Sequence, residues 1–190
     1  MLNNKLKITG GLYKSRSLSF NPQKLLKPTK SYIRESIFNI IKIEKRMVCL
    51  DLFSGSGILS AEFISRGGEK AVLVENNHKT CQKINKEFQH LQIKNYDLRC
   101  LNVFIFIKNH ENKNYDIIFI DAPFDTNDLY RSLKLLDENG FLLKNKFIYI
   151  EQSKNHYNAE AVSIISKTHN ILKDLSIGDV SYTIAKKRDK

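Results

Sequence analysis

The apolar positions from Met47 to Leu52 are interrupted only by Asp51, the single charged residue of this stretch. These apolar positions lack a helical period, which is typical of a strand covered on both faces. A turn with two glycines, residues 53–57, follows, and apolar positions at helical spacing then predict a helix over residues 57–66. The stretch therefore predicts a strand, a glycine loop and a helix in succession.

Beyond this unit, apolar segments of strand length alternate with segments of helical period. We expect helices near residues 77–90 and 127–137, and strands near residues 70–74, 97–102, 115–120, 147–151, 162–173 and 179–186. Such alternation is the signature of an α/β fold, a mostly parallel sheet with helices on both faces. The last two strands are joined by a link too short for a parallel crossover, so we expect them to be antiparallel neighbours at one sheet edge.

The N-terminal part of the chain predicts a smaller unit. Residues 5–20 alternate loosely between apolar and polar positions around Gly10-Gly11, which predicts a short hairpin. Two prolines then bracket a connecting loop. We therefore divide the chain into a basic N-terminal hairpin with its linker, residues 1–28, and a core domain, residues 29–190.

A helix is predicted after this loop, with Thr29 or Ser31 as its N-cap. Its buried stripe would consist of four isoleucines at i, i+4, i+7 and i+8, namely Ile33, Ile37, Ile40 and Ile41. Lys30, Arg34 and Asn39 would lie on its other faces.

Length and composition are those of an ordinary globular protein. The chain has 190 residues, enough for one sizeable core. No apolar run approaches the ~18 residues that span a bilayer, so we expect a cytoplasmic protein with no membrane association. The three cysteines, Cys49, Cys81 and Cys100, and the five histidines lack metal-ligand spacing, and we assign no metal.

Most of the positive charge lies near the N-terminus. The whole chain has a formal net charge of +11, and residues 1–46 hold eleven lysines and arginines against two glutamates, a net +9. Clustered basic residues are the footprint of proteins that bind phosphate backbones. A lysine-rich surface that only keeps the protein soluble fits this asymmetry less well. We therefore expect a nucleic acid partner.

The glycine loop is a candidate nucleotide site. Gly55 and Gly57 allow positive φ and the close approach of a ligand. Eighteen residues past Gly57, a second apolar strand ends on Glu75, about the separation at which a dinucleotide fold places an acid against ribose hydroxyls. Ser60 stands where the dehydrogenase fingerprint has its third glycine, which weakens a dehydrogenase interpretation.

A second candidate site follows the most apolar strand, residues 115–120. It is the tetrapeptide Asp121-Ala122-Pro123-Phe124. Ligands of open α/β sheets lie at the carboxyl ends of strands, so this tetrapeptide should face the same crevice as the glycine loop. Pro123 biases Ala122 towards an extended conformation, which can aim the Ala122 carbonyl outward beside the Asp121 carboxylate. Two acceptors and a flat apolar ring suit a base that carries an exocyclic amino group.

Together these motifs resemble the RsmD family of bacterial small-subunit rRNA guanine-N2 methyltransferases over nearly the whole chain. The segments that carry the resemblance are Gly11-Leu12-Tyr13-Lys14-Ser15-Arg16, Lys27-Pro28-Thr29, Arg34-Glu35-Ser36-Ile37-Phe38-Asn39 and Asp51-Leu52-Phe53-Ser54-Gly55-Ser56-Gly57. The chain departs from the family at three positions. Ala122 replaces the first proline of the family's D-P-P-F motif, Ser15 a usual glycine and Lys27 a usual arginine. Alanine still supplies a carbonyl acceptor, in a less rigid loop.

The resemblance implies a class I S-adenosylmethionine-dependent methyltransferase, with a Rossmann-like, seven-stranded, mostly parallel sheet, preceded by the basic hairpin. It implies that S-adenosyl-L-methionine binds at Asp51, Phe53, Ser54, Gly55, Gly57, Glu75, Asn76 and Asn102. The implied catalytic residues are Asp121, Ala122, Pro123 and Phe124. The candidate RNA contacts are Tyr13, Lys14, Arg16, Lys30 and Arg34. The implied partner is small-subunit rRNA or an assembling 30S particle, and we expect the enzyme to be a monomer.

The implied reaction is methylation of the N2 amino group of a guanine in 16S rRNA. Asp121 and the Ala122 carbonyl would bind the amino hydrogens and localise the nitrogen lone pair, and Phe124 would stack on the exposed base. Two other functions stay open: adenine-N6 methylation of DNA or RNA, and non-catalytic RNA binding on the same fold. At the level of residues, Asp121 could instead cap the next helix, Phe124 could be core, and Arg34 and Asn39 could be solvated helix surface.

Overall fold

The computed structural model describes residues 5–20, 29–111 and 114–189. Its elements in chain order are β1 (Lys5–Lys7), β2 (Ser17–Ser19), α1 (Ser31–Ile40), β3 (Val48–Leu52), α2 (Ile58–Ser65), β4 (Lys70–Glu75), α3 (His78–His90), β5 (Tyr96–Cys100), α4 (Val103–Asn109), β6 (Ile117–Ile120), α5 (Asp128–Glu138), β7 (Phe147–Ser153), the 3-10 helix η1 (Lys154–His156), α6 (Ala159–Ser166), β8 (His169–Ile177) and β9 (Val180–Lys187). The predicted linker, residues 21–28, lies outside the described residues.

The main sheet has the strand order β5-β4-β3-β6-β7-β9-β8. The first five of these strands are parallel, and β9 pairs antiparallel with both β7 and β8. The predicted Rossmann-like sheet and its antiparallel edge are thereby confirmed. From β3 the chain moves outward through β4 and β5, then returns to β6 on the other side of β3. The strand order therefore switches between β3 and β6, which is where such sheets bind ligands.

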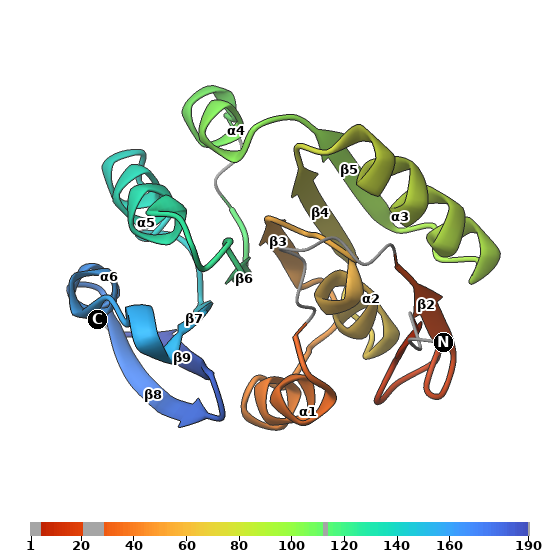
Figure 1. Ribbon diagram of the computed structural model, residues 1–190, viewed down its shortest axis with the longest axis horizontal. Helices are drawn as coiled ribbons and strands as arrows, with labels where there is room; N and C mark the ends of the chain where they lie inside the picture. The colour runs from red at the N-terminus through yellow and green to blue at the C-terminus, as the bar shows by residue number, and fades with distance from the viewer. Residues whose placement is uncertain (1–4, 21–28, 112–113, 190) are drawn as a thin grey trace.

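Helices cover both faces of this sheet. Figure 1 shows α1, α2 and α3 on one face and α4, α5 and α6 on the other. The predicted isoleucine stripe of α1 packs in the first core, where Ile33, Ile37 and Ile41 are fully buried. Leu133 of α5 and Ile165 of α6 are buried in the second core. In the described ranges, no helix combines the length and apolar composition needed to cross a bilayer.

Helix α4 is absent from the sequence prediction. Its first five residues, 103–107, are all apolar and only the last two are polar, so the sequence shows no helical period there. The signal that could have revealed it is Asn102, an N-cap whose side chain accepts a hydrogen bond from the Phe104 amide at 2.9 Å.

A strand is predicted over residues 162–173, but helix α6 forms the first part of this segment, up to Ser166. The strand prediction is therefore wrong there. Asn158 caps this helix by accepting from the Ala161 amide at 3.1 Å. The strand in this region, β8, begins only at His169.

The N-cap predicted for α1 is also wrong. Lys30 occupies that position, and no side chain of the described residues caps the helix. Neither Thr29 nor Ser31 therefore serves as the predicted cap.

The N-terminal hairpin is present, and its turn docks on the C-terminal end of α2. Lys5 pairs with Ser19 in an antiparallel two-stranded sheet. A Cβ at Gly11 would lie 1.8 Å from the carbonyl oxygen of Ser65, so only glycine allows this close approach. The Leu12 amide donates to the same oxygen at 2.6 Å. The hairpin is thus attached to the helix whose other end begins at the glycine loop.

Ser15 in this hairpin has a φ of 71°, in the left-handed region that favours glycine. Ser15 is one of the positions at which the sequence departs from the family that it resembles. Glycine would adopt this backbone conformation more readily, so the conformation implies strain at the serine.

Candidate active site

The glycine loop makes a sharp turn between β3 and α2. Phe53, Gly55 and Gly57 all have positive φ, of 60°, 52° and 73°. The Gly57 amide donates to the Ser54 carbonyl at 2.7 Å and closes the turn. Gly57 is also the N-cap of α2. The loop therefore ends where the positive end of the helix dipole begins.

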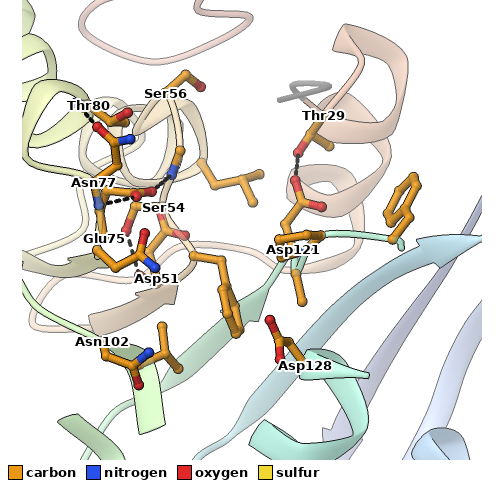
Figure 2. Close-up of a pocket in the computed structure, with 18 of the residues that line it drawn as sticks. Thr29, Asp51, Ser54, Ser56, Glu75, Asn77, Thr80, Asn102, Asp121 and Asp128 are labelled. Atoms are coloured by element: carbon orange, nitrogen blue, oxygen red, sulfur yellow. Dashed lines mark hydrogen bonds between the residues drawn. The ribbon is translucent and has the colours of Figure 1, made fainter. Parts of the chain in front are cut away.

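Glu75, at the end of β4, braces this loop. Its carboxylate accepts from the Gly55 amide at 3.0 Å and from the Asn77 amide at 2.8 Å (Figure 2). Burial raises the pKa of Glu75, and the backbone hydrogen bonds from Asn77 and Gly55 oppose that shift. The acid that the sequence assigned to ribose is thus held against the loop.

Asp51, at the end of β3, is buried beneath the loop. Burial raises its pKa to about 7, although Ser60 stabilises the charged form. The Ser60 hydroxyl donates to Oδ2 of Asp51 at 2.6 Å. Ser60, which replaces the third glycine of the dehydrogenase fingerprint, therefore supplies a hydrogen bond that glycine could not.

A cavity of about 410 Å³ opens at the carboxyl ends of β3, β4 and β6. Seven of the eight residues predicted to bind the cofactor line it: Asp51, Phe53, Ser54, Gly55, Glu75, Asn76 and Asn102. Gly57 does not line the cavity, because it lies behind the loop, where a Cβ would meet the Phe88 ring at 3.2 Å. The role of Gly57 is therefore to shape the turn.

The cavity wall also contains residues that sequence reasoning missed. Phe104 lies on the unpredicted helix α4, Thr29 precedes α1 and Asp128 begins α5. For Phe104 the available signal was its position two residues after the capping Asn102.

The chemistry of this wall fits S-adenosylmethionine. A carboxylate, Glu75, suits a ribose diol, since both hydroxyls can donate to it. Val103 and Phe104 offer an apolar surface for a purine ring, and the Asn102 amide lies beside them. When bound, this group would present an electrophilic methyl carried by a sulfonium.

Asp121 directly follows β6, across the switch point from the glycine loop. It is half-buried, lines the cavity and accepts a hydrogen bond on Oδ2 from the Thr29 hydroxyl at 3.1 Å (Figure 2). Burial, together with the neighbouring Glu151, raises the pKa of Asp121 well above its usual value. The next helix begins at Asp128 with Asn127 as its N-cap. Asp121 is therefore not the cap of that helix.

Phe124 lies between two cavities. With Ala122 and Pro123 it lines the first cavity and a second one of about 300 Å³, whose far side includes Glu151 and Tyr130. Phe124 is only partly buried against the core. The ring therefore keeps an accessible surface, unlike an ordinary core side chain.

Arg34 does not lie on an exposed face, so its predicted RNA contact is wrong. It is 2% exposed. Its Nε donates to Glu62 at 3.0 Å, Nη2 to the Lys7 carbonyl at 2.7 Å and Nη1 to the Thr29 carbonyl. The hairpin covers this face of α1, and the buried Glu62 of α2 provides the counter-charge. Asn39 does lie at the surface, as the alternative interpretation held.

The other candidate RNA contacts remain accessible. Lys14, Arg16 and Lys30 are exposed, and Tyr13 is half-buried. The Arg16 guanidinium lies over the Tyr13 ring, 5.7 Å from its centroid. These hairpin side chains therefore form a surface on which a planar cation and an aromatic ring are stacked.

Comparisons with known proteins agree with this site. The sequence model of the family described as conserved hypothetical protein 95 matches residues 6–186. Ribosomal RNA small subunit methyltransferase D of Buchnera aphidicola subsp. Acyrthosiphon pisum is 39% identical over 153 residues, 80% of each chain. The protein of the same name from Haemophilus influenzae is 30% identical over 94% of this chain and 92% of its own. The solved structure of yhhF from Escherichia coli has a TM-score of 0.80 at 26% identity and covers 96% of this chain and 98% of its own. The chain belongs to this family, the RsmD family, and is an S-adenosylmethionine-dependent methyltransferase.

Proposed function

We propose that this enzyme methylates the exocyclic N2 amino group of a guanine in small-subunit rRNA. The observation that carries the proposal is the position of Asp121 and Ala122, which follow β6 at the switch in strand order, beside the cofactor cavity. The curated relatives are named for the RNA of the small ribosomal subunit. A carboxylate and a neighbouring carbonyl supply two acceptors for the two hydrogens of one amino group.

The amino nitrogen of guanine is a poor nucleophile, because its lone pair is delocalised into the ring. Asp121 and the Ala122 carbonyl hold its hydrogens and favour a pyramidal nitrogen, and the Asp121 carboxylate accepts the departing proton. Phe124 stacks on the base, which has to leave its own stack to reach the cavity. The positive charge of the sulfonium, when the methyl donor is bound in the cavity, would favour the ionised form of Asp121. This would lower the pKa of Asp121, which burial raises.

We assign RNA binding to the basic residues ahead of position 47, those of the hairpin unit, residues 1–28, and Lys30 among them, and methyl transfer to the domain formed by residues 29–190. Residues 1–46 hold a net +9 of the chain's +11. Affinity for RNA should therefore fall steeply with salt. Replacing both Lys14 and Arg16 by alanine should make the plot of log affinity against log salt concentration less steep. The slope should change by roughly 0.7 for each phosphate contact to a single strand that is lost. Lys134→Ala, which removes an exposed charge from α5, is the control and should leave the slope unchanged.

The proposed partner is rRNA within an assembling 30S particle or free of it, bound by an enzyme monomer in the cytoplasm, where ribosomes form. Methylation assays on naked rRNA and on purified subunits separate the two substrates. Light scattering of the purified enzyme measures its mass in solution.

Mass spectrometry of nucleosides tests the chemistry. Small-subunit rRNA from cells that lack the protein should lose one N2-methylguanosine, and purified enzyme with the methyl donor should restore it. Recovery of N6-methyladenosine instead would establish the adenine reaction. A protein that binds RNA and restores no methyl group would be a non-catalytic RNA-binding protein.

A further inference from the structure

Thr29 is a buried residue whose hydroxyl points at the proposed catalytic carboxylate. The sequence predicts a helix cap at this position, yet the N-cap of α1 is Lys30. Thr29 is 1% exposed, and its Oγ1 donates to Oδ2 of Asp121 at 3.1 Å (Figure 2). Among the described residues, none donates to Oδ1 of Asp121. Thr29 therefore occupies one carboxylate oxygen and leaves the other for a substrate.

The backbone of Thr29 is held in turn by Arg34. The guanidinium Nη1 donates to the Thr29 carbonyl, while Nη2 and Nε are bound to the Lys7 carbonyl and to Glu62. The planar fork of arginine fixes these three directions at once. Glu62 is fully buried and also accepts from the Thr9 amide at 2.9 Å. The hairpin, α1 and α2 together thus determine where the Thr29 hydroxyl lies.

From these contacts we propose that Thr29 is a positioning residue for methyl transfer, which fixes the orientation of the Asp121 carboxylate, and that Arg34 holds Thr29 in register. The inference rests on the proposed catalytic role of Asp121. It also links two of the segments that carry the family resemblance, the one that ends on Thr29 and the one that begins at Arg34.

The surroundings of Asp121 determine what the loss of this hydrogen bond would do. Glu151 of β7 and Asp51 of β3 both face Asp121, and their charges disfavour its ionised form. Tyr149 of β7 donates its hydroxyl to Glu151, at 2.5 Å, rather than to Asp121. Among the groups of the described residues, the Thr29 hydroxyl favours the ionised carboxylate through its hydrogen bond. Removing its hydroxyl should therefore raise the pKa of Asp121 and move the acid limb of the kcat profile to higher pH.

Lys30 and Thr29 also act on Glu151, since both favour its charged form. Burial raises the pKa of Glu151 to about 6, so its charge also changes across the acid limb. The Thr29 variant that loses the hydrogen bond therefore has to differ from the wild type in the hydroxyl alone, so that no change of shape is added to that loss. Thr29→Val has the same shape and no donor, and Thr29→Ser keeps the donor.

The experiment measures kcat, KM for each substrate and the pH profile of kcat for the full-length enzyme. Thr29→Val should lower kcat by about tenfold, the value of one charge-assisted hydrogen bond at the lower end of its range, and should shift the acid limb upward with KM for the methyl donor unchanged. Thr29→Ser should restore both quantities. Arg34→Lys, which keeps the charge but loses the fork, should lower kcat in the same way. Ser31→Ala, an exposed neighbour on the same segment, is the matched control and should behave as wild type.

Two results would overturn the inference. One is a folded Thr29→Val enzyme with wild-type kcat and an unshifted acid limb. The other is a loss of activity that Thr29→Ser does not restore, which would mean that side-chain shape and not the hydroxyl matters. Asp121→Ala is assayed in parallel. Full activity of that variant would refute the proposed role of Asp121 itself, whereas an inactive Asp121→Ala beside an unaffected Thr29→Val would refute only the positioning role.

Discussion

Replacing Glu62 by glutamine removes the negative charge that two guanidinium groups share. The Glu62 carboxylate is fully buried and accepts from Arg34 Nε at 3.0 Å and from Arg66. Removing one partner of a buried ion pair costs about 3–5 kcal/mol, because the other charge stays buried and uncompensated. Arg66 is 17% exposed and can regain water, whereas Arg34 is 2% exposed and cannot. We therefore expect Glu62→Gln to lower the free energy of unfolding by about 3 kcal/mol, the lower end of that range.

Urea denaturation near neutral pH, followed by circular dichroism, measures this loss. Glu44→Gln is the control, because Glu44 is 66% exposed and its ion pair with Lys146 spans 3.3 Å at the surface. Such a pair contributes about 0–1 kcal/mol. If Glu62→Gln lost no more stability than Glu44→Gln, the network around Arg34 would not hold the hairpin to the core. The chain of contacts that leads to Thr29 would then lack its anchor.

Five further substitutions test the site and the hairpin. Asp121→Ala should lower the rate of methyl transfer by about 10²–10³ with nearly unchanged cofactor affinity, and Ala122→Pro should be neutral or mildly activating. Transfer of labelled methyl and calorimetric titration measure these effects, and an active Asp121→Ala would contradict them. Glu75→Ala should weaken cofactor binding by about 1.5–3 kcal/mol, since a charge-assisted acceptor is lost and the Gly55 amide loses its brace. Equal calorimetric affinities would remove this acid from the cofactor site. Ser15→Gly should raise the free energy of unfolding by about 1 kcal/mol by relieving left-handed strain, and a loss on denaturation would argue against it. Asp51 has a pKa raised to about 7, so the folded state binds its proton more tightly than the unfolded state and loses stability as pH rises from about 4 to about 7. Asp51→Asn should flatten this part of the stability profile in urea titrations, and a profile parallel to wild type would exclude Asp51 as its source.

The parts of the fold and site that the sequence predicts well are those fixed by local pattern. The strand before the glycine loop, Glu75 and Asp121 each follow an apolar run, and the carboxyl ends of parallel strands necessarily meet at one edge of the sheet. Their convergence in a cavity could therefore be predicted from the sequence alone. Helix α4 could not be predicted from periodicity, since a run of five apolar residues followed by two polar ones has no period to detect.

The part that sequence reasoning missed depends on contacts between distant segments. The sequence pattern predicts a solvated face for Arg34, because nothing within its own helix shows that the hairpin covers it. Its burial depends on Glu62, 28 positions further along the chain, and on Lys7, 27 positions before it. Thr29 was predicted to be a cap for the same reason. Its hydroxyl instead donates a hydrogen bond to Asp121, 92 positions further along the chain. Rules that use only neighbouring residues cannot predict such a contact.

Helix α2 sets the distance between the glycine loop and the N-terminal hairpin. All eight of its residues are buried, and it runs about 12 Å, at 1.5 Å per residue, from the glycine loop to the carbonyl of Ser65 on which the hairpin turn docks. An insertion of one residue would rotate the C-terminal end of the helix by about 100° and carry Ser65, on which the hairpin turn docks, to another side of the helix axis. The length of α2 therefore determines both where the glycine loop ends and where the hairpin docks.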